Sequence, residues 1–207
     1  MDILDLDRRA LAAAGDQVAR VSAGQLGDPT PCLHWTLRDL LAHMVAHNHG
    51  FAAAARGETV PAAVWDGGQV GDDPYPAYLE SARLASDAFA APGALDRQIE
   101  LPGLGAFPLR IAIGFHFVDY LIHGWDVARA IGAASGPGSG PDGGADSELT
   151  ATALKFASRW PDSPPARGPG SPFGPKVEVP AGAPPFDRLL GLLGRPPDWT
   201  AAPPSTA

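Results

Sequence analysis

The sequence predicts an all-α protein, most simply a four-helix bundle followed by a Pro-rich C-terminal extension. Apolar residues recur at three- and four-residue intervals in four long segments, which is the spacing of amphipathic helices and not of strands. The 25 Gly and 23 Pro residues gather between these segments and in the C-terminal third of the chain. The second and fourth segments, at roughly 20 residues and 30 Å each, have the usual length of a bundle helix.

Start and stop signals place the four helices along the chain. Thr36 is a good N-cap, and Asp39 three residues later forms an approximate capping box with it. Gly132 is a plausible stop for the fourth helix. The four helices are expected at residues 4–26, 36–57, 75–91 and 109–131.

Shorter elements are expected outside the bundle. A hairpin can form at residues 99–109 around a Gly-Leu-Gly turn. The Gly/Pro/Ser-rich residues 133–148 should form a loop that does not pack. A helix then runs from Asp146 or Ser147 to Trp160, residues 161–185 wrap the surface, and a last short helix covers 186–193 before Gly194. We therefore predict a bundle core at 1–135 and a loop-rich extension of the same domain at 136–207.

Composition narrows the class of protein. A net charge of −8 without a run of Lys or Arg argues against nucleic acid as a partner. No segment approaches the roughly 20 apolar residues of a membrane span, and the acidic N-terminus is unlike a secretory signal. A single Cys excludes an internal disulfide and suits a reducing compartment. We expect a cytoplasmic protein, a monomer or a homodimer.

The fourth helix carries ionisable residues that its apolar character does not explain. Four of them share a sector about 80° wide beside an apolar stripe. Burying an unpaired charge costs roughly several kcal/mol unless a partner or a metal ion neutralises it. Asp119 and His123 are one turn apart, so their side chains can meet at one point. The four residues are His116, Asp119, His123 and Asp126.

The second helix offers a further ligand, but helical spacing does not select it. His43 and His47 lie about 40° apart on one face, beside the apolar stripe, and either could join Asp119 and His123. Imidazole and carboxylate ligands together suit zinc, nickel or ferrous iron. Three protein ligands leave one coordination position open, as in catalytic zinc sites.

Structural interpretations compete with this metal site. Asp119 and His123 can form an ordinary intrahelical hydrogen bond. His116 can be a polar neighbour, and Asp126 can pair with Arg129 one turn later. Cys32 is more often a small buried apolar residue than a nucleophile.

Three segments resemble the mycothiol-dependent maleylpyruvate isomerase-like family, in its metal-binding subgroup, within the DinB/YfiT-like superfamily. They are TPCLHWTLRDLLAHMVAHN (30–48), FVDYLIHGWDVARAIG (117–132) and FDRLLGLLGRPPDW (186–199). The resemblance implies an up-down-down-up four-helix bundle with a metal ion in a cleft between helices. It also selects His43 over His47, which gives His43, Asp119 and His123 as the metal ligands.

The resemblance implies a metal-dependent thiol transferase or isomerase of the mycothiol type. Zinc is the expected ion, with nickel or iron as alternatives, and a low-molecular-weight thiol would be the co-substrate of a small-molecule substrate. His47 and His116 are candidate proton shuttles. The alternative is a non-catalytic bundle that binds a metal or a small ligand. Two departures bear on the reaction: Asp119 stands where the isomerase has Glu, and the isomerase has a sizeable C-terminal domain.

Overall fold

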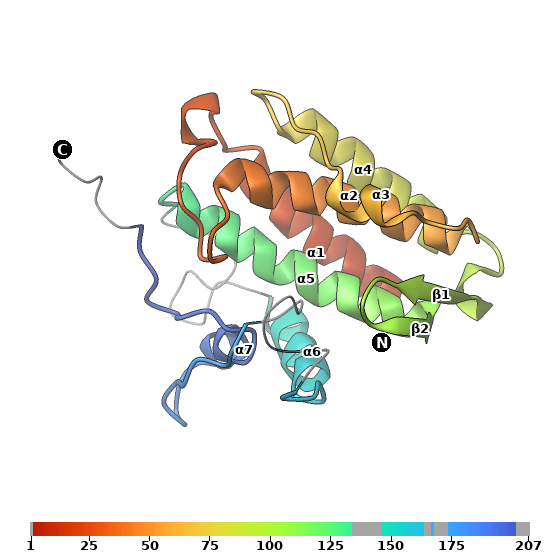
Figure 1. Ribbon diagram of the computed structural model, residues 1–207. Helices are drawn as coiled ribbons and strands as arrows, with labels where there is room; N and C mark the ends of the chain where they lie inside the picture. The colour runs from red at the N-terminus through yellow and green to blue at the C-terminus, as the bar shows by residue number, and fades with distance from the viewer. Residues whose placement is uncertain (1, 134–145, 164–166, 168–173, 202–207) are drawn as a thin grey trace.

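Four long helices form a bundle, as Figure 1 shows for the computed structural model, which describes residues 2–133, 146–163, 167 and 174–201. The shared capping bonds of Thr36 and Asp39 start the second of them as predicted, and Gly132 follows the last with φ 66°. The four helices are α1 (Ile3–Val18), α2 (Leu37–Ala55), α4 (Tyr75–Phe89) and α5 (Leu109–Ala130).

Contacts between the helices give their directions. Residue numbers rise together along α1 and α5, and again along α2 and α4, so each of these pairs is parallel. They rise in opposite directions along α2 and α5, which makes that pair antiparallel. The contacts are Asp7–His116 and Ala14–Gly124, Asn48–Ser81 and Phe51–Phe89, and Met44–Tyr120 and Asn48–His116. The predicted up-down-down-up order is thus confirmed.

The first helix is shorter than predicted. It ends at Val18, and the chain turns before a short 3-10 helix, η1 (Ala23–Gln25), begins. The backbone N–H of Ser22 donates to Gln25 Oε1 at 3.1 Å and so opens this new element. Apolar spacing continued past residue 18 because Leu26 is buried in the same core, although it belongs to a different element.

Short elements connect and extend the bundle. The predicted hairpin is present as β1 (Gln98–Leu101) and β2 (Gly105–Pro108), an antiparallel pair. Helix α3 (Ala62–Asp66) and the 3-10 helix η2 (Ala94–Asp96) were not predicted. Helix α6 (Ser147–Ala157) begins at the predicted N-cap but ends before Trp160, and α7 (Pro185–Leu192) occupies the predicted last helix.

The two C-terminal helices pack on each other and on the bundle (Figure 1). Leu149 of α6 and Leu189 of α7 are buried in the same core cluster as residues of α1 and α5. Residues 134–145, which hold most of the predicted loop and the predicted boundary at 135, lie outside the described residues, as do parts of 161–185. None of the helices in the described ranges is long and apolar enough to cross a membrane.

Candidate metal centre

The α2 N-terminus anchors one half of the site. The Thr36 hydroxyl lies 2.6 Å and its backbone N–H 2.9 Å from Asp39 Oδ2. These bonds lower the pKa of Asp39, so its charge stays at the helix N-terminus, where it is favourable. One and two turns further on, His43 and His47 project towards α5, with ring centroids 3.8 Å apart.

The loop before α2 is organised around Thr30. Its hydroxyl accepts from the Cys32 backbone N–H at 3.1 Å and lies 3.0 Å from the Trp35 carbonyl oxygen. This compact turn places the Trp35 ring 4.7 Å from the His43 ring, between centroids. The Thr-Pro-Cys…Trp pattern of the sequence thus has a structural basis, since it shapes one wall of the site.

Asp119 of α5 lies at the centre of the histidine cluster. Its Oδ1 is 3.2 Å from His123 Nε2, and its Oδ2 is 3.6 Å from His43 Nε2 and 3.9 Å from His47 Nδ1. The structure therefore brings together the three predicted ligands His43, Asp119 and His123, and it adds His47 to them. One ligand atom each from His43, His47 and Asp119 lie within 4.8 Å of one another, as a common ion requires, whereas His123 falls in a second such group with Cys32 and Asp126.

Two atoms of this cluster are buried without a hydrogen-bond partner among the described residues. They are His43 Nε2 and Asp119 Oδ2, which face each other. A buried polar atom left unpaired costs about 1–3 kcal/mol, so such atoms in a native protein indicate a missing partner. A divalent cation bound by both atoms would remove this cost, and the donor set fits such an ion.

Burial and neighbouring charge shift the pKa values in opposite directions within the cluster. Burial lowers the pKa of His43, and burial with the neighbouring His43 ring lowers the pKa of His47 to about 3. Burial also opposes charge on Asp119 and His123, but their mutual attraction outweighs it. The pKa of Asp119 is therefore well below its usual value, and that of His123 well above.

Asp126 supports His123 from the opposite side of the ring. Its Oδ2 lies 2.9 Å from His123 Nδ1, 3.0 Å from Arg195 Nη2 and 3.1 Å from Cys32 Sγ. The alternative in which Asp126 pairs with Arg129 is not found among the described residues, because Arg129 donates to the Pro197 carbonyl oxygen instead. Arg195 follows α7, so spacing within a helix could not predict this contact.

His116 belongs to a different, fully buried network. Its Nδ1 lies 2.7 Å from Asp7 Oδ1, and its Nε2 lies 3.1 Å from Asn48 Oδ1. Ser81 donates to the Tyr78 carbonyl oxygen and so accepts from Asn48, which turns the Asn48 oxygen towards His116. Both ring nitrogens are engaged there, and the structure does not bring His116 to the cluster around Asp119.

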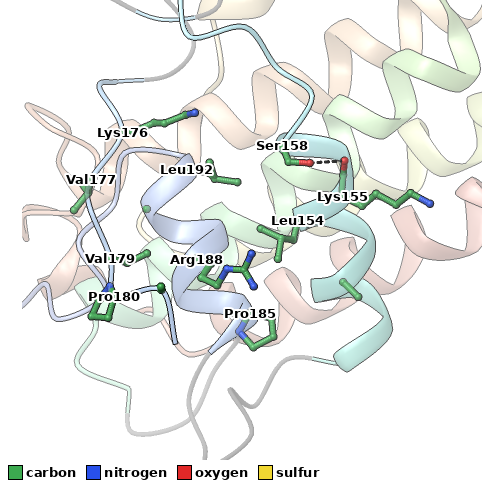
Figure 2. A pocket seen from close by; sticks show the side chains of 13 residues that line it. Leu154, Lys155, Ser158, Lys176, Val177, Val179, Pro180, Pro185, Arg188 and Leu192 are labelled. Carbon is green, nitrogen blue, oxygen red and sulfur yellow. Dashed lines mark hydrogen bonds between the residues drawn. The ribbon is translucent and has the colours of Figure 1, made fainter. Parts of the chain in front are cut away.

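A groove between α6 and α7 lies apart from these residues (Figure 2). Apolar side chains such as Leu154, Val179 and Leu192 line it, together with Lys155 and Arg188. No His, Cys, Asp or Glu is among the residues that line it, so the groove offers no metal ligand.

The fold and the site together define a class, a DinB-like helical bundle with a His/Asp cluster between two of its helices. Residues 8–128 match the family described as "Mycothiol maleylpyruvate isomerase N-terminal domain", and the chain belongs to this family. The match ends just beyond His123 and Asp126, so it includes every member of the cluster.

Comparison with known proteins gives one relative that is similar over almost its whole sequence and one solved structure with a similar fold. It is 37% identical over 195 residues to the uncharacterized protein Rv0738 of Mycobacterium tuberculosis, which covers 94% of this chain and 98% of that one. Among solved structures, the mycothiol-dependent maleylpyruvate isomerase matches with a TM-score of 0.58 at 17% identity, over 75% of this chain. This chain spans 66% of the length of that isomerase, and the likeness shows the shared fold.

Proposed function

We propose that this chain binds one divalent metal ion and uses it to act on a low-molecular-weight thiol, as a transferase or isomerase. One observation carries the metal site: His43 Nε2 and Asp119 Oδ2 are buried, face each other at 3.6 Å and have no hydrogen-bond partner among the described residues. Family membership supports the thiol, because the family is described by a mycothiol-dependent isomerase.

The ligand set favours zinc, with nickel or iron as alternatives. His43, Asp119 and His123 would hold the ion through imidazole nitrogen and carboxylate oxygen. A divalent ion bound there would supply Lewis acidity and lower the pKa of a bound thiol. The nickel and iron alternatives use the same atoms, so metal analysis must decide between them.

The surroundings of the cluster suit a small-molecule substrate. The side chains of Asp119 and His47 are 23% and 27% exposed, while the Asp119 Oδ2 atom that faces His43 is buried. The Trp35 ring lies beside His43 and the Trp65 ring 5.6 Å from His47, between centroids, which gives the approach an aromatic wall. Such a wall favours a substrate with an apolar portion. A thiol co-substrate also agrees with the cytoplasmic location that we propose from the single Cys.

The role of His47 distinguishes a catalytic metal site from a non-catalytic one. Its position next to Asp119 and solvent fits a proton shuttle. Its pKa of about 3 fits a fourth metal ligand better, since a neutral imidazole binds metal but accepts protons poorly. A sphere closed by four protein ligands would favour the second candidate, a non-catalytic metal-binding bundle.

The first experiment measures metal and tests its ligands. Purified protein is expected to contain about one divalent ion per chain, and His43→Ala and Asp119→Asn to lose most of it. His49→Ala is the matched control, because His49 lies on the same helix but is exposed. Equal metal content in the control and both variants, or none in the wild type, would overturn the metal site.

The second experiment tests the thiol. Metal-loaded protein is expected to bind a mycothiol-type thiol and to consume it with at least one of a panel of electrophiles. Bound metal with neither thiol binding nor turnover would support the non-catalytic candidate instead. His47→Ala separates the roles of that residue: loss of metal marks a ligand, whereas retained metal with an altered pH–rate profile marks a proton shuttle.

A further inference from the structure

A single carboxylate oxygen behind His123 receives three donors. Asp126 is fully buried, and its Oδ2 lies within 3.1 Å of His123 Nδ1, Arg195 Nη2 and Cys32 Sγ. Burying a carboxylate is costly unless it is paired and hydrogen-bonded, and here the Arg195 guanidinium supplies the opposite charge. The Arg195 guanidinium therefore balances the charge of the Asp126 carboxylate.

Arg195 comes from the far end of the chain. It follows α7 and reaches back 69 positions to Asp126, as the blue segment that leads from α7 towards the end of α5 in Figure 1 illustrates. Its Nη1 donates to the Leu193 carbonyl oxygen at 2.7 Å, which holds the guanidinium in one orientation. Its side chain is only 11% exposed.

The hydrogen bond to Asp126 determines which nitrogen of His123 is available. When Nδ1 carries the proton and donates to Asp126, the lone pair of the neutral ring lies on Nε2, which faces Asp119 at 3.2 Å. A carboxylate that fixes the tautomer and plane of a ligand histidine strengthens metal binding, and losing such a partner costs about 10–100-fold in affinity.

We propose that Arg195 is a positioning residue of the metal centre: it holds the Asp126 carboxylate in place, and Asp126 in turn presents His123 Nε2 to the ion. This inference rests on the proposed metal site and deepens it. It makes the C-terminal extension a functional part of the centre, although Arg195 itself touches neither the ion nor the substrate.

The test compares metal affinity in three variants of the full chain, by competition with a chelator of known affinity for Zn²⁺. We expect Asp126→Asn to weaken binding about 10–100-fold and Arg195→Gln about tenfold, with partial recovery in Arg195→Lys. Arg129→Gln is the matched control. Arg129 ties the same tail to the same helix through the Pro197 carbonyl oxygen but does not touch Asp126.

A spectroscopic signal separates positioning from mere loss of packing. In the zinc-loaded wild type, ¹⁵N-labelled histidine is expected to show one His123 tautomer, with the proton on Nδ1. Arg195→Gln should change that signal, while Arg129→Gln should leave it as it is.

Each outcome has a distinct meaning. If the wild type binds no metal, the proposed function fails together with this inference. If the wild type binds Zn²⁺ and Arg195→Gln binds it equally well with an unchanged tautomer, only the inference is overturned. It is also overturned if Arg129→Gln weakens binding as much as Arg195→Gln, because docking of the tail would then explain both losses.

Discussion

At the scale of single residues, the cluster around Asp119 combines groups whose charges are set by their neighbours. His43 and His47 have lowered pKa values and are neutral near pH 7, whereas Asp119 is ionised. His123 differs, because carboxylates on both sides raise its pKa well above the usual value despite its burial. The metal-free centre therefore holds one proton that an incoming ion must displace.

Metal binding at pH 7 should accordingly release about one proton, because His123 must be neutral to act as a ligand. Affinity should fall as pH falls, by about tenfold per unit, since below its raised pKa the folded protein carries this proton. Calorimetry in two buffers of different ionisation enthalpy measures the number of protons released when the metal binds. His49→Ala should leave it unchanged, and release of no proton, or of two or more, would contradict the assignment of charges.

Sequence reasoning found part of this centre. Helical spacing brought Asp119 and His123 together, and it narrowed the third ligand to His43 or His47; only the family resemblance chose His43. Helical spacing did not reveal the partners of Asp126, because Cys32 lies in a loop and Arg195 follows a distant helix. Such contacts depend on tertiary packing, and the one signal for them was a buried carboxylate in an apolar helix.

At the scale of elements, the five-residue helix α3 shows why short segments escape prediction. Periodicity needs at least two turns to be recognised, and the five residues of α3 form fewer than two. Its position is fixed instead by Trp65, whose ring packs on α2 at Gly50. The same ring forms part of the aromatic wall beside His47. The long helices were predicted because their cores repeat over several turns.

Gly50 should not tolerate a side chain while Trp65 is present. A Cβ at this position would lie 2.6 Å from the Trp65 ring, so we expect Gly50→Ala to destabilise the protein by about 1–3 kcal/mol. In a Trp65→Ala background the same change should stabilise it by up to about 1 kcal/mol, as Ala normally does in a helix. Urea unfolding of the four variants measures this coupling, and equal effects in both backgrounds would refute the close packing.

At the scale of the whole molecule, one polar network joins all four bundle helices. Asp7 of α1, Asn48 of α2, Ser81 of α4 and His116 of α5 are buried and hydrogen-bonded in a chain. The orientation of Asn48 requires His116 Nε2 to donate, and the other ring nitrogen, Nδ1, lies 2.7 Å from the Asp7 carboxyl group. This network explains why a His on an apolar helix need not be a ligand.

Removing one residue of this buried polar network should therefore lower the stability of the whole protein more than it weakens metal binding. We expect Asp7→Ala to lower the free energy of unfolding by about 1–3 kcal/mol, because the buried His116 ring loses a hydrogen-bond partner. Asp16→Ala, an exposed position on the same helix, should change it by no more than about 0.5 kcal/mol. Denaturant unfolding of the metal-free proteins measures both, and a small effect of Asp7→Ala would show that the pair contributes little.

The antiparallel pairing of α2 and α5 also has a kinetic consequence. Residues of the two helices that meet near the centre, such as Met44 and Tyr120, are 76 positions apart in the chain, so the histidines and Asp119 converge only after both helices have docked. We expect an ion that needs this convergence to bind only after the main folding barrier has been crossed. Bound metal should then slow the unfolding of the native bundle, while the rate at which the chain folds should stay almost unchanged.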